Sequence, residues 1–437
     1  MEQQTVKVLV LGAGFGGLTF CQKFRHARAE VTVVDRTNHH LFQPLLYQVA
    51  AAGLAAPDIA QPVRSILANR PRVIVLLDQV LDINLSSRQV TLAHTTFSFD
   101  YLVIALGSVT SYFGHPEWEQ FAPGLKTIED ALRIRSQILL AFELAETLAD
   151  PAARQRLMTI VIVGGGPTGV ELAGSFAELA RTVLKRDFRR IDPSQARIIL
   201  IEAASGILNH LPSDLIESAT RQLKNLGVEV RTSTRVKSIR AHEVELEGGE
   251  VLVAENILWA AGVSATILTK KLGVDLDRAG RVKVNPDLSV PGFPNTFAIG
   301  DLALVLQEDG KPVPGVSPAA MQMAKHVATI IADEIDLGAG RAPRPAFKYW
   351  DKGTMATIGR SAAVAMVGKL KFSGLIAWLA WLFVHLIFLI GLRNKIIVLA
   401  QWAYSYLTYN RSARIITGLP QIPPEKVELK GVTRSSV

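Results

Sequence analysis

The feature that most constrains the fold of this 437-residue chain is a glycine-rich loop between two apolar runs near its start. Residues 8–11 are branched and apolar, and a second run, 31–34, ends in Asp35. A G-x-G-x-x-G pattern and a stretch that can form a helix lie between them. This order predicts a complete βαβ unit that binds a dinucleotide. The loop residues expected around the pyrophosphate are Gly12, Ala13, Gly14, Phe15, Gly16 and Gly17.

Each glycine of this loop has an expected function. Gly12 permits a tight turn, Gly14 lets the backbone approach the phosphates, and Gly17 lets the helix pack on the strand. The helix N-terminus offers free N–H groups and the positive end of its dipole to the phosphates. Asp35 lies where a carboxylate can accept both hydroxyls of an adenosine ribose. A glycine-rich structural turn in another kind of α/β protein is the alternative.

The same pattern begins again at residue 159. An apolar run, 160–163, precedes a second glycine-rich loop, and the next apolar run, 198–201, ends in Glu202. The extra length of this unit holds a basic helical insert, residues 181–193. Glu202 favours NADH over NADPH because a carboxylate repels a 2′-phosphate, a preference that nearby arginines can offset. The loop residues expected to contact this nucleotide are Gly164, Gly166, Thr168 and Gly169.

Two such units in one chain indicate a tightly held FAD in the first and a nicotinamide nucleotide in the second. Gly107 and Gly262 each end an apolar strand, where the chain can pass close to a nucleotide. Asp301 follows a third such strand and suits a hydrogen bond to the FAD ribitol. The helix that begins near Pro318 can direct its N-terminal N–H groups at the flavin. Residues before about 113 and after about 265 then belong to one interrupted sheet.

Composition excludes several other functions. Cys21 is the only cysteine, so the chain forms no intramolecular disulfide, dithiol relay or cysteine metal cluster, and a sulfide:quinone oxidoreductase with redox cysteines is excluded. The net charge of +8 favours an anionic membrane surface. We exclude nucleic acid because no arginine-rich or aromatic-interleaved segment is present. We interpret His39 and His40 as a polar turn beside the cofactor rather than a metal site. The N-terminus has no cleavable apolar core, so the enzyme domains are expected in the cytoplasm.

The C-terminal part contains the most apolar stretch. Residues 372–392 carry no formal charge, and their length could span a bilayer. Residues 401–414 mix polar and aromatic side chains, as in a helix that lies in the membrane interface. We favour a monotopic platform that dips into one leaflet. A single span and a helical pair buried in a dimer are the alternatives.

Together these residues resemble the type II NADH dehydrogenases, the single-subunit NADH:quinone oxidoreductases that do not pump protons. The resemblance covers nearly the whole chain. It is carried by residues 12–17, 38–50, 164–171, 298–301, 320–322 and 351–360 and by the aromatic C-terminus. It implies an α/β fold with two Rossmann-like dinucleotide-binding domains, similar to glutathione reductase, and a C-terminal membrane-anchoring helical region. The expected boundaries are 1–112 and 266–345 for the FAD domain, 113–265 for the NADH domain and 346–437 for the C-terminal cap and helices.

The resemblance also implies roles for individual residues. Contacts to non-covalent FAD are implied for Gly12 to Gly16, Asp35, Arg36, Val80 and Asp301, with Ala319 and Ala320 near the flavin ring. Contacts to NADH are implied for Gly164 to Gly169, Glu171, Glu202 and Gly262. Gln322 and Lys352 would face the quinone. Many members carry two glutamines four residues apart in that helix, whereas here Pro318 occupies the first position.

The implied reaction is hydride transfer from NADH to N5 of FAD, followed by two-electron reduction of a membrane quinone without proton pumping. The implied assembly is a homodimer on the cytoplasmic face of the cell membrane. Glu171 is a candidate for placing the nicotinamide or steering protons; the alternative is a structural acid at a helix N-terminus. Two other functions remain open: a soluble NADH-dependent reductase of an iron–sulfur protein, and a non-enzymatic, membrane-bound NADH redox sensor.

Overall fold

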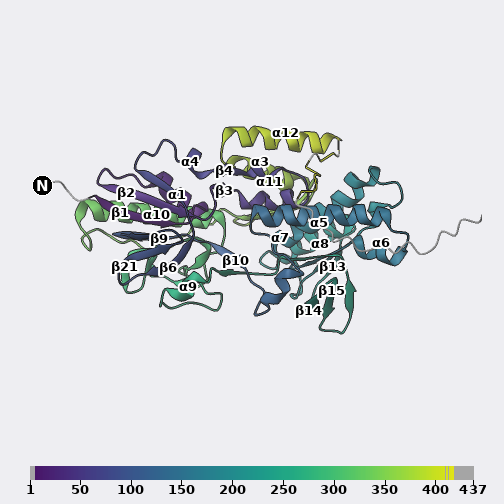
Figure 1. The fold of residues 1–437 in the computed structure, drawn as a ribbon, viewed down its shortest axis with the longest axis horizontal. Coiled ribbons are helices and arrows are strands. Elements are labelled where there is room, and N and C mark those ends of the chain that lie inside the picture. The colour runs from purple at the N-terminus through teal and green to yellow at the C-terminus, as the bar shows by residue number, and fades with distance from the viewer. Residues whose placement is uncertain (1–4, 409, 412, 418–437) are drawn as a thin grey trace, which may run out of the picture.

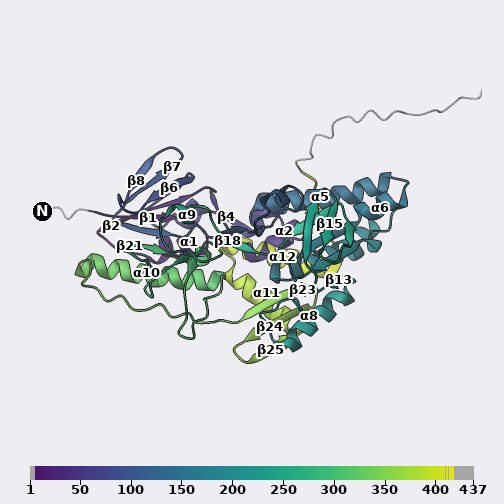
Figure 2. The same ribbon diagram turned by 90° about the horizontal axis from the view of Figure 1, so that it is seen from below.

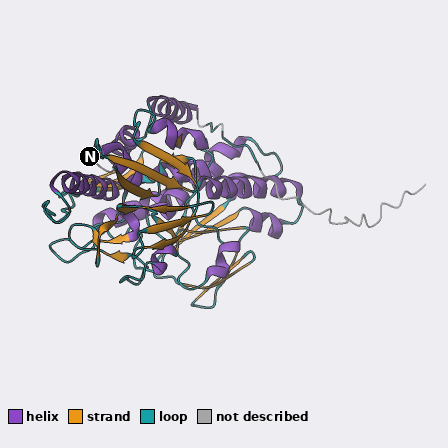
Figure 3. Ribbon diagram, turned by 60° about the vertical axis from the view of Figure 1, so that its left-hand side comes forward, coloured by secondary structure: helices purple, strands orange, loops and turns teal. Residues whose placement is uncertain are grey.

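The structure is a computed structural model that describes residues 5–408, 410–411 and 413–417. Two α/β domains lie side by side, and the C-terminal helices run along the upper edge where they meet (Figure 1). Strands form the interior layers, and helices cover them (Figure 3). The end of the expected 346–437 region lies outside the described residues.

The N-terminal domain is built on a six-stranded sheet of order β20-β21-β9-β1-β2-β5. All neighbours except β20 and β21 are parallel. Branched apolar side chains fill the central strands because both faces of a parallel sheet are covered. Helix α10 runs beneath this sheet (Figure 2) and packs against α1. The elements are β1 (Val6–Leu11), α1 (Phe15–Lys23), β2 (Ala29–Asp35), β5 (Val73–Leu77), β9 (Tyr101–Ile104), β20 (Ser289–Val290), β21 (Phe293–Ala298) and α10 (Ser317–Leu337).

The second domain repeats this arrangement with a four-stranded parallel sheet of order β13-β12-β11-β17. Its strands correspond in order to β5, β2, β1 and β9 of the first domain. The sheet and its helices comprise α5 (Ile128–Thr147), α6 (Pro151–Leu157), β11 (Thr159–Val163), α7 (Pro167–Glu178), β12 (Arg197–Ile201), α8 (Ser213–Asn225), β13 (Glu229–Arg231) and β17 (Asn256–Trp259). The prediction of two Rossmann-like domains is confirmed.

Each domain carries a three-stranded antiparallel meander before its last repeated strand. The first consists of β6 (Val80–Asn84), β7 (Gln89–Leu92) and β8 (Thr96–Ser98), and the second of β14 (Val236–Arg240), β15 (Glu243–Leu246) and β16 (Val251–Val253). The two chain crossings between the domains pair as an antiparallel ribbon of β10 (Ser108–Thr110) and β18 (Val263–Ala265). The ribbon joins the domains just after β9 and β17 end.

An insertion after β2 reaches the second domain. It contains β3 (His39–Leu41), η1 (Gln43–Leu45), α2 (Leu46–Ala50), α3 (Ala56–Ile59), β4 (Ala60–Pro62) and α4 (Val63–Ile66). Helix α2 packs on α5 and α7. The remaining short elements are η2 (Pro116–Gln120), α9 (Leu268–Lys271), β19 (Val282–Lys283), η6 (Gly300–Leu302) and β22 (Ala303–Leu304).

The C-terminal cap consists of an antiparallel sheet and two helices: β23 (Thr354–Gly359), β24 (Ala362–Val367), β25 (Leu370–Ser373), α11 (Leu375–Phe388) and α12 (Leu392–Thr408). Figure 2 shows the sheet beside α8. Residues 372–392 do not form one helix, because β25 ends at Ser373 and Gly374 has φ +66° before α11 begins. The 14 residues of α11 extend about 21 Å, whereas a hydrocarbon core is about 30 Å thick.

Within the described residues, we find no helix with both the length and the apolar character needed to cross a bilayer. The structure divides residues 372–392, for which a single span was one alternative, between β25 and α11.

The expected helical insert at 181–193 is only partly helical. Helix α7 continues into a π-helical segment, η3 (Leu179–Val183), and then into η4 (Leu184–Arg186), and η5 (Pro193–Gln195) precedes β12. Residues 187–192 have no helical structure. Their backbone instead bonds to a carboxylate of α5, since Glu146 accepts hydrogen bonds from the N–H groups of residues 189–191.

Candidate functional site

The first glycine-rich loop is tightly packed on one side and open on the other. Gly12 has φ +96°, and a Cβ there would lie 2.5 Å from the carbonyl oxygen of Ala105. A Cβ on Gly17 would lie 1.8 Å from the carbonyl oxygen of Gly12. At Gly14 a Cβ would meet nothing within 4 Å. The loop therefore fits a ligand that approaches the backbone closely at Gly14, as the pyrophosphate of FAD would.

Asp35 fixes this loop to the end of β2. Its Oδ2 accepts a hydrogen bond from the Ala13 N–H (2.6 Å), and its Oδ1 accepts the N–H and hydroxyl of Thr37 (2.7 and 2.8 Å). A carboxylate has about four lone-pair positions, so one remains for a ribose hydroxyl. Exposed Arg36 follows at once. His40 also holds the loop, since its Nδ1 donates a hydrogen bond to the Ala13 carbonyl oxygen at 3.0 Å.

The second loop repeats the glycine geometry of the first. Gly164 has φ +112°, and its Cβ would lie 2.5 Å from the carbonyl carbon of Ala260. A Cβ on Gly169 would lie 1.8 Å from the Gly164 carbonyl oxygen, and one on Gly166 would meet nothing within 4 Å. Thr168 is exposed in the first turn of α7, beside this opening.

Glu202 holds the second loop as Asp35 holds the first. Its Oε2 accepts the Gly165 N–H at 2.6 Å, and its Oε1 accepts the Ala204 N–H at 2.7 Å. Gly165 follows the first glycine of its loop, as Ala13 does in the other loop. Two loops in one chain thus present the same backbone opening beside the same kind of acid.

Asp301 lies at the junction of the domains, in η6. Ser108 donates its hydroxyl to Oδ2 of Asp301 at 2.9 Å, and Lys126 Nζ donates to that hydroxyl oxygen at 3.2 Å. Burial lowers the pKa of Lys126, and the charge of Asp301 opposes that shift. Sequence reasoning missed Ser108 and Lys126, because no local pattern relates residues so distant in the chain. Other residues around the small cavity at Asp301 include Gly300, Ala319, Ala320 and Met323.

The start of α10 offers fewer free donors than expected. Pro318 has no N–H, and the N–H groups of Ala319 and Ala320 both donate to the Val316 carbonyl, at 3.1 and 3.2 Å. The expectation of several free N–H groups directed at the flavin is therefore wrong for residues 318–320. The dipole of a 21-residue helix remains at this end.

The remaining expected nucleotide contacts lie around the ribbon and the first meander. Gly107 precedes β10 and has φ +68°, whereas Gly262 precedes β18 and lies under the ring of Phe113. A Cβ on Gly262 would be 2.5 Å from that ring. Val80 is buried at the start of β6.

Gln322 contacts the backbone of Trp350 through both ends of its amide. Its Nε2 donates to the Trp350 carbonyl at 3.0 Å, and its Oε1 accepts the Trp350 N–H at 2.9 Å. Two residues further on, the exposed Lys352 places Nζ 5.3 Å from the ring centroid of Trp350 and 5.4 Å from that of Phe388. Both distances allow cation–π attraction. The structure thus joins α10, a cationic side chain and the end of α11 at one place.

Glu171 lies on α7, the helix that packs on β23 of the cap. Burial raises the pKa of its carboxyl well above the ordinary range, and a hydrogen bond from the Thr357 backbone opposes that shift. Burial and then the charge of Glu171 raise the pKa of Tyr47. The Tyr47 hydroxyl accepts a hydrogen bond from Gln48 Nε2 at 2.9 Å, and Trp402 Nε1 donates to Gln48 Oε1 at 2.8 Å. Sequence reasoning missed this chain of side chains from α7 to α12.

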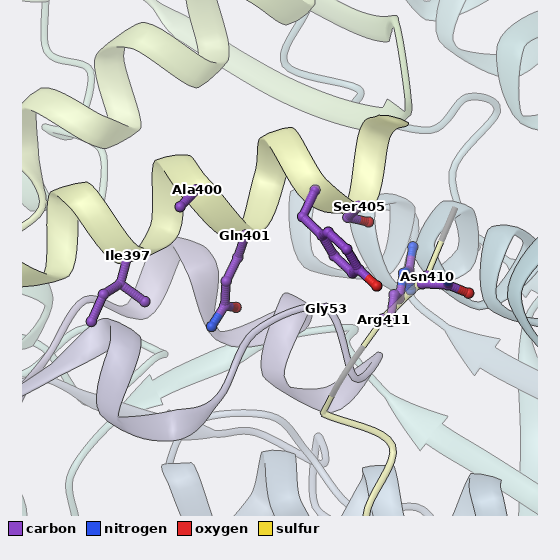
Figure 4. Close-up of a pocket in the computed structure, with 8 residues that line it drawn as sticks. Gly53, Ile397, Ala400, Gln401, Ser405, Asn410 and Arg411 are labelled. Atoms are coloured by element: carbon purple, nitrogen blue, oxygen red, sulfur yellow. The ribbon is translucent and has the colours of Figure 1, made fainter. Parts of the chain in front are cut away.

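A cavity of about 250 Å³ separates α12 from the loop after α2. Figure 4 shows Ile397 and Gln401 pointing from α12 toward the segment that holds Gly53. Arg411 forms one end, where its guanidinium donates to the Ala51 carbonyl (2.8 Å) and pairs with Glu178 (3.0 Å). The lining is mixed: Gly53, Ile397, Ala400, Gln401, Tyr404, Ser405, Asn410 and Arg411. The cavity therefore offers both apolar and polar contacts to a ligand.

The outer side of α11 and α12 is an exposed apolar face. Its large side chains are at least one-third exposed: Leu375, Ile376, Leu379, Phe383, Ile387, Phe388, Leu392, Ile396, Leu399 and Leu407. The opposite side is packed into the protein, since Trp381, Val398 and Trp402 belong to its largest buried cluster. An apolar surface of this extent marks a contact with a membrane or another protein.

Comparison with known families decides between the functions that the sequence left open. The family described as pyridine nucleotide-disulphide oxidoreductase matches residues 6–324, and the NDH2 C-terminal domain matches residues 351–410. The type II NADH:quinone oxidoreductase Ndh of Mycobacterium tuberculosis is 44% identical over 423 residues, which cover 94% of this chain and 90% of the relative. This chain belongs to the type II NADH:quinone oxidoreductase family. The predicted family, an FAD-dependent NADH dehydrogenase, is confirmed.

A second relative agrees with this assignment, and two solved structures share the fold. NdhA of the same organism is 44% identical and covers 94% of this chain and 89% of the relative. NDH2 from Plasmodium falciparum, solved in complex with NADH, superposes with a TM-score of 0.86 at 20% identity over 95% of this chain and all of that chain. A sulfide:quinone oxidoreductase from Aquifex aeolicus shares the fold at a TM-score of 0.69 and 19% identity. The family favours neither the iron–sulfur reductase nor the redox sensor.

Proposed function

We propose that this member of the family oxidises NADH at the second glycine-rich loop while FAD is held at the first, and that electrons leave to a membrane quinone near the cap. The observation that carries the proposal is that the two loops have the same local geometry. In each loop the middle glycine has free space where a Cβ would be, and an acidic side chain accepts a hydrogen bond from the loop backbone. The ribbon of β10 and β18 brings the domains together at the ends of these units.

FAD, when bound, would supply the two-electron chemistry between a hydride donor and a quinone. The protein orients the two nucleotides, which is the main requirement of hydride transfer. Gly12 to Gly17, with Arg36 and Val80, hold FAD at the phosphates and adenosine. Ser108 and Lys126 hold Asp301 in place for a ribitol hydroxyl. Gly107, Gly262, Ala319 and Ala320 surround the ring end.

NADH is proposed to bind through the second loop. Gly166 leaves the opening for the pyrophosphate, and Thr168 stands beside it at the start of α7. Glu202 accepts hydrogen bonds from two loop N–H groups, and a 2′-phosphate placed near its carboxylate would be repelled. NADH is therefore the expected donor rather than NADPH.

Quinone reduction consumes two protons, and two groups near the cap are placed to serve it. Glu171 has a carboxyl whose raised pKa keeps it protonated at a pH where an exposed glutamic acid is ionised. Lys352 presents a cation between Trp350 and Phe388, next to the exposed apolar face. Gln322 acts in this arrangement by holding Trp350, since both ends of its amide are already bonded. The cavity along α12 is the proposed channel for the quinone.

The exposed apolar face is proposed to dip into one leaflet, so that a lipid-soluble quinone reaches the cavity from the bilayer. The aliphatic and aromatic side chains of α11 and α12 suit the interface. We place the protein on the cytoplasmic side because NADH is found there. The homodimer stays a prediction that sedimentation of the detergent-solubilised protein would test.

Steady-state assays of purified membranes test this proposal. We expect NADH oxidation to depend on added ubiquinone or menaquinone analogues, with NADPH a poor donor. Release of a yellow, FAD-containing protein on solubilisation is expected as well. NADH oxidation that no quinone accelerates would contradict the proposal.

A further inference from the structure

The basic insert between α7 and β12, residues 181–193, is not explained by nucleotide or quinone binding. It contains five basic and two acidic residues. Both acids are bonded within the protein: Asp187 pairs with Arg414, and Asp192 accepts the N–H and hydroxyl of Ser194. A third acid, Glu146 of α5, accepts three backbone N–H groups of the insert. The nearby carboxylates therefore fold the insert.

The apolar side chains of the insert point inward. The ring of Phe188 lies 6.2 Å from that of Phe142 on α5, and Ile191 packs against the same buried cluster. Arg181 also serves the fold, because its guanidinium donates to the carbonyls of Ala196 and Gly227. These contacts hold the insert in one conformation and determine which side chains remain at the surface.

Four cations remain on the outside: Lys185, Arg186, Arg189 and Arg190 are all exposed. In the part of the chain that the structure describes, none of them forms a salt bridge. Glu146 lies near enough to Arg190, and Asp192 to Lys185, for their charges to interact. Arg189 keeps its charge at the surface while its Nη1 donates to the carbonyls of Arg186 and Phe188. Four neighbouring cations repel one another unless an anionic partner neutralises them.

The insert adjoins the exposed apolar face. Arg414 follows α12 closely, pairs with Asp187 of the insert, and donates its Nε to the Arg411 carbonyl at 2.8 Å. Leu407, at the end of α12, is 82% exposed. In Figure 1 the insert, in blue-green beyond the end of α12, rises on the same upper side as that helix. A bilayer that receives the apolar face would bring its headgroups to the insert.

We propose that the four cations of the insert bind the phosphates of anionic lipids at the border of the apolar face. The inference rests on the membrane attachment proposed above and adds the class of lipid. Basic residues next to an inserted apolar surface are attracted by the negative potential of anionic headgroups, and this attraction weakens as salt screens it. Two forces then attach the protein: burial of α11 and α12, and charge at the insert.

Vesicle flotation of the holoenzyme tests the proposal. The probes are vesicles of phosphatidylcholine alone and of an equal mixture with phosphatidylglycerol. We expect the double variant Arg186→Gln, Arg190→Gln to bind the mixed vesicles about 30-fold more weakly at low salt, since two basic residues near the surface are lost. Its binding to the neutral vesicles and its turnover with a water-soluble quinone analogue should not change.

The matched control is the double variant Lys270→Gln, Arg278→Gln. It removes an exposed cation of α9, which lies on the lower side in Figure 1, and a second exposed cation a few residues after that helix. The proposal expects this control to bind mixed vesicles as the unmodified protein does. An equal loss in the control, or full binding by the insert variant, would overturn it. If the unmodified protein binds both kinds of vesicle equally, the lipid class is wrong while membrane attachment stands. If it binds neither, the attachment itself is wrong.

Discussion

At the scale of single residues, Asp35 and Glu202 perform the same task in different loops. Each accepts the N–H of the residue after the first loop glycine, at 2.6 Å, and that of a residue just beyond its own strand. A charged group that satisfies buried N–H donors contributes more than a neutral one, about 1.5–3 kcal/mol for each bond. The two acids therefore permit a separation of the two nucleotide sites by mutation.

We predict that Asp35→Ala loses most of its FAD on purification, whereas Glu202→Ala keeps its FAD. In Glu202→Ala the KM for NADH should instead rise about 10–100-fold, because the loop loses two charged hydrogen bonds. The variant should also prefer NADH over NADPH less strongly. Flavin content per chain and steady-state kinetics with both donors check this. Loss of flavin from both variants alike would contradict separate sites.

Glu171 gives a prediction about pH. Because burial raises the pKa of this carboxyl, it holds its proton until the pH rises through that raised value. If the proton serves the quinone, turnover with saturating quinone falls as the pH rises through it. Glu171→Gln should retain FAD, turn over about 100-fold more slowly at low pH, and lose this pH dependence. Unchanged turnover in the variant would assign Glu171 a structural role.

Gln322 is predicted to act through the segment that it holds. Gln322→Ala removes both hydrogen bonds to Trp350, each worth about 1 kcal/mol, and frees Lys352. The KM for quinone should rise about 10-fold while the KM for NADH stays unchanged. Lys325→Ala, an exposed position on the same helix, is the control. A rise in both KM values would show that the variant disturbs α10 as a whole.

Much of the geometry of the two glycine-rich loops could be predicted at this scale because its constraints are local. Gly12 and Gly14 have spacings that a backbone turn and a phosphate require, and the acid follows at the end of the next strand. The contacts of Asp301 could not be predicted, since Ser108 is 193 residues away in sequence. Nor does sequence show that Gln322 is already bonded to Trp350.

At the scale of elements, α7 connects the second glycine-rich loop with the cap. Gly174 lets α7 meet β23, because a Cβ there would lie 1.6 Å from the Ile358 carbonyl oxygen. Glu171 lies one turn before Gly174 in α7, and Glu178, at the end of the helix, pairs with Arg411 beyond α12. One helix thus begins at a nucleotide loop and contacts the cap along its length.

The two C-terminal helices combine structural and surface roles. Trp381 and Trp402 are buried in the largest core cluster, so truncation before Phe372 would remove part of that core. Substitutions on the outer side leave this core intact, so they test membrane attachment more cleanly than a truncation does.

We predict that the double variant Leu379→Ser, Phe383→Ser is released from the membrane and keeps its FAD. These side chains are 52% and 66% exposed and lie four residues apart on one side of α11. Burying two such side chains is worth about 3 kcal/mol or more, so membrane affinity should fall at least about 100-fold. Membrane fractionation measures it. Val251→Ser, Val253→Ser on β16 is the control, and equal release of both variants would contradict the prediction.

Elements could be predicted where the sequence shows a clear hydrophobic period or a capping or turn residue at the boundary. The other elements could not be predicted. Helix α5 is of the first kind, because Thr127, directly before its first residue, caps it. Residues 372–392 carry no formal charge and are mostly apolar, so no hydrophobic period in their sequence separates one span from a strand and a shorter helix. The structure breaks the stretch at Gly374, whose positive φ ends the strand. Residues 187–192 are not helical, and the N–H groups of residues 189–191 bond to the carboxylate of Glu146 instead.

At the scale of the whole molecule, the chain is one α/β unit used twice and joined by a cap. The second sheet repeats the strand order of the first, and the meanders occupy equivalent places. The first domain is interrupted by the second, so the chain crosses twice and the crossings pair as β10 and β18. This connection places two nucleotide sites at one junction, with the apolar face above it.

The central claim is that electrons from NADH reach a quinone through FAD held in the first of these units. Anaerobic rapid mixing of the purified holoenzyme tests it most directly, with flavin absorbance followed first after NADH and then after a quinone analogue. We expect stoichiometric NADH to bleach the absorbance and the quinone to restore it, both at least as fast as steady-state turnover. A protein without flavin, or one whose bleached absorbance no quinone restores, would contradict the account.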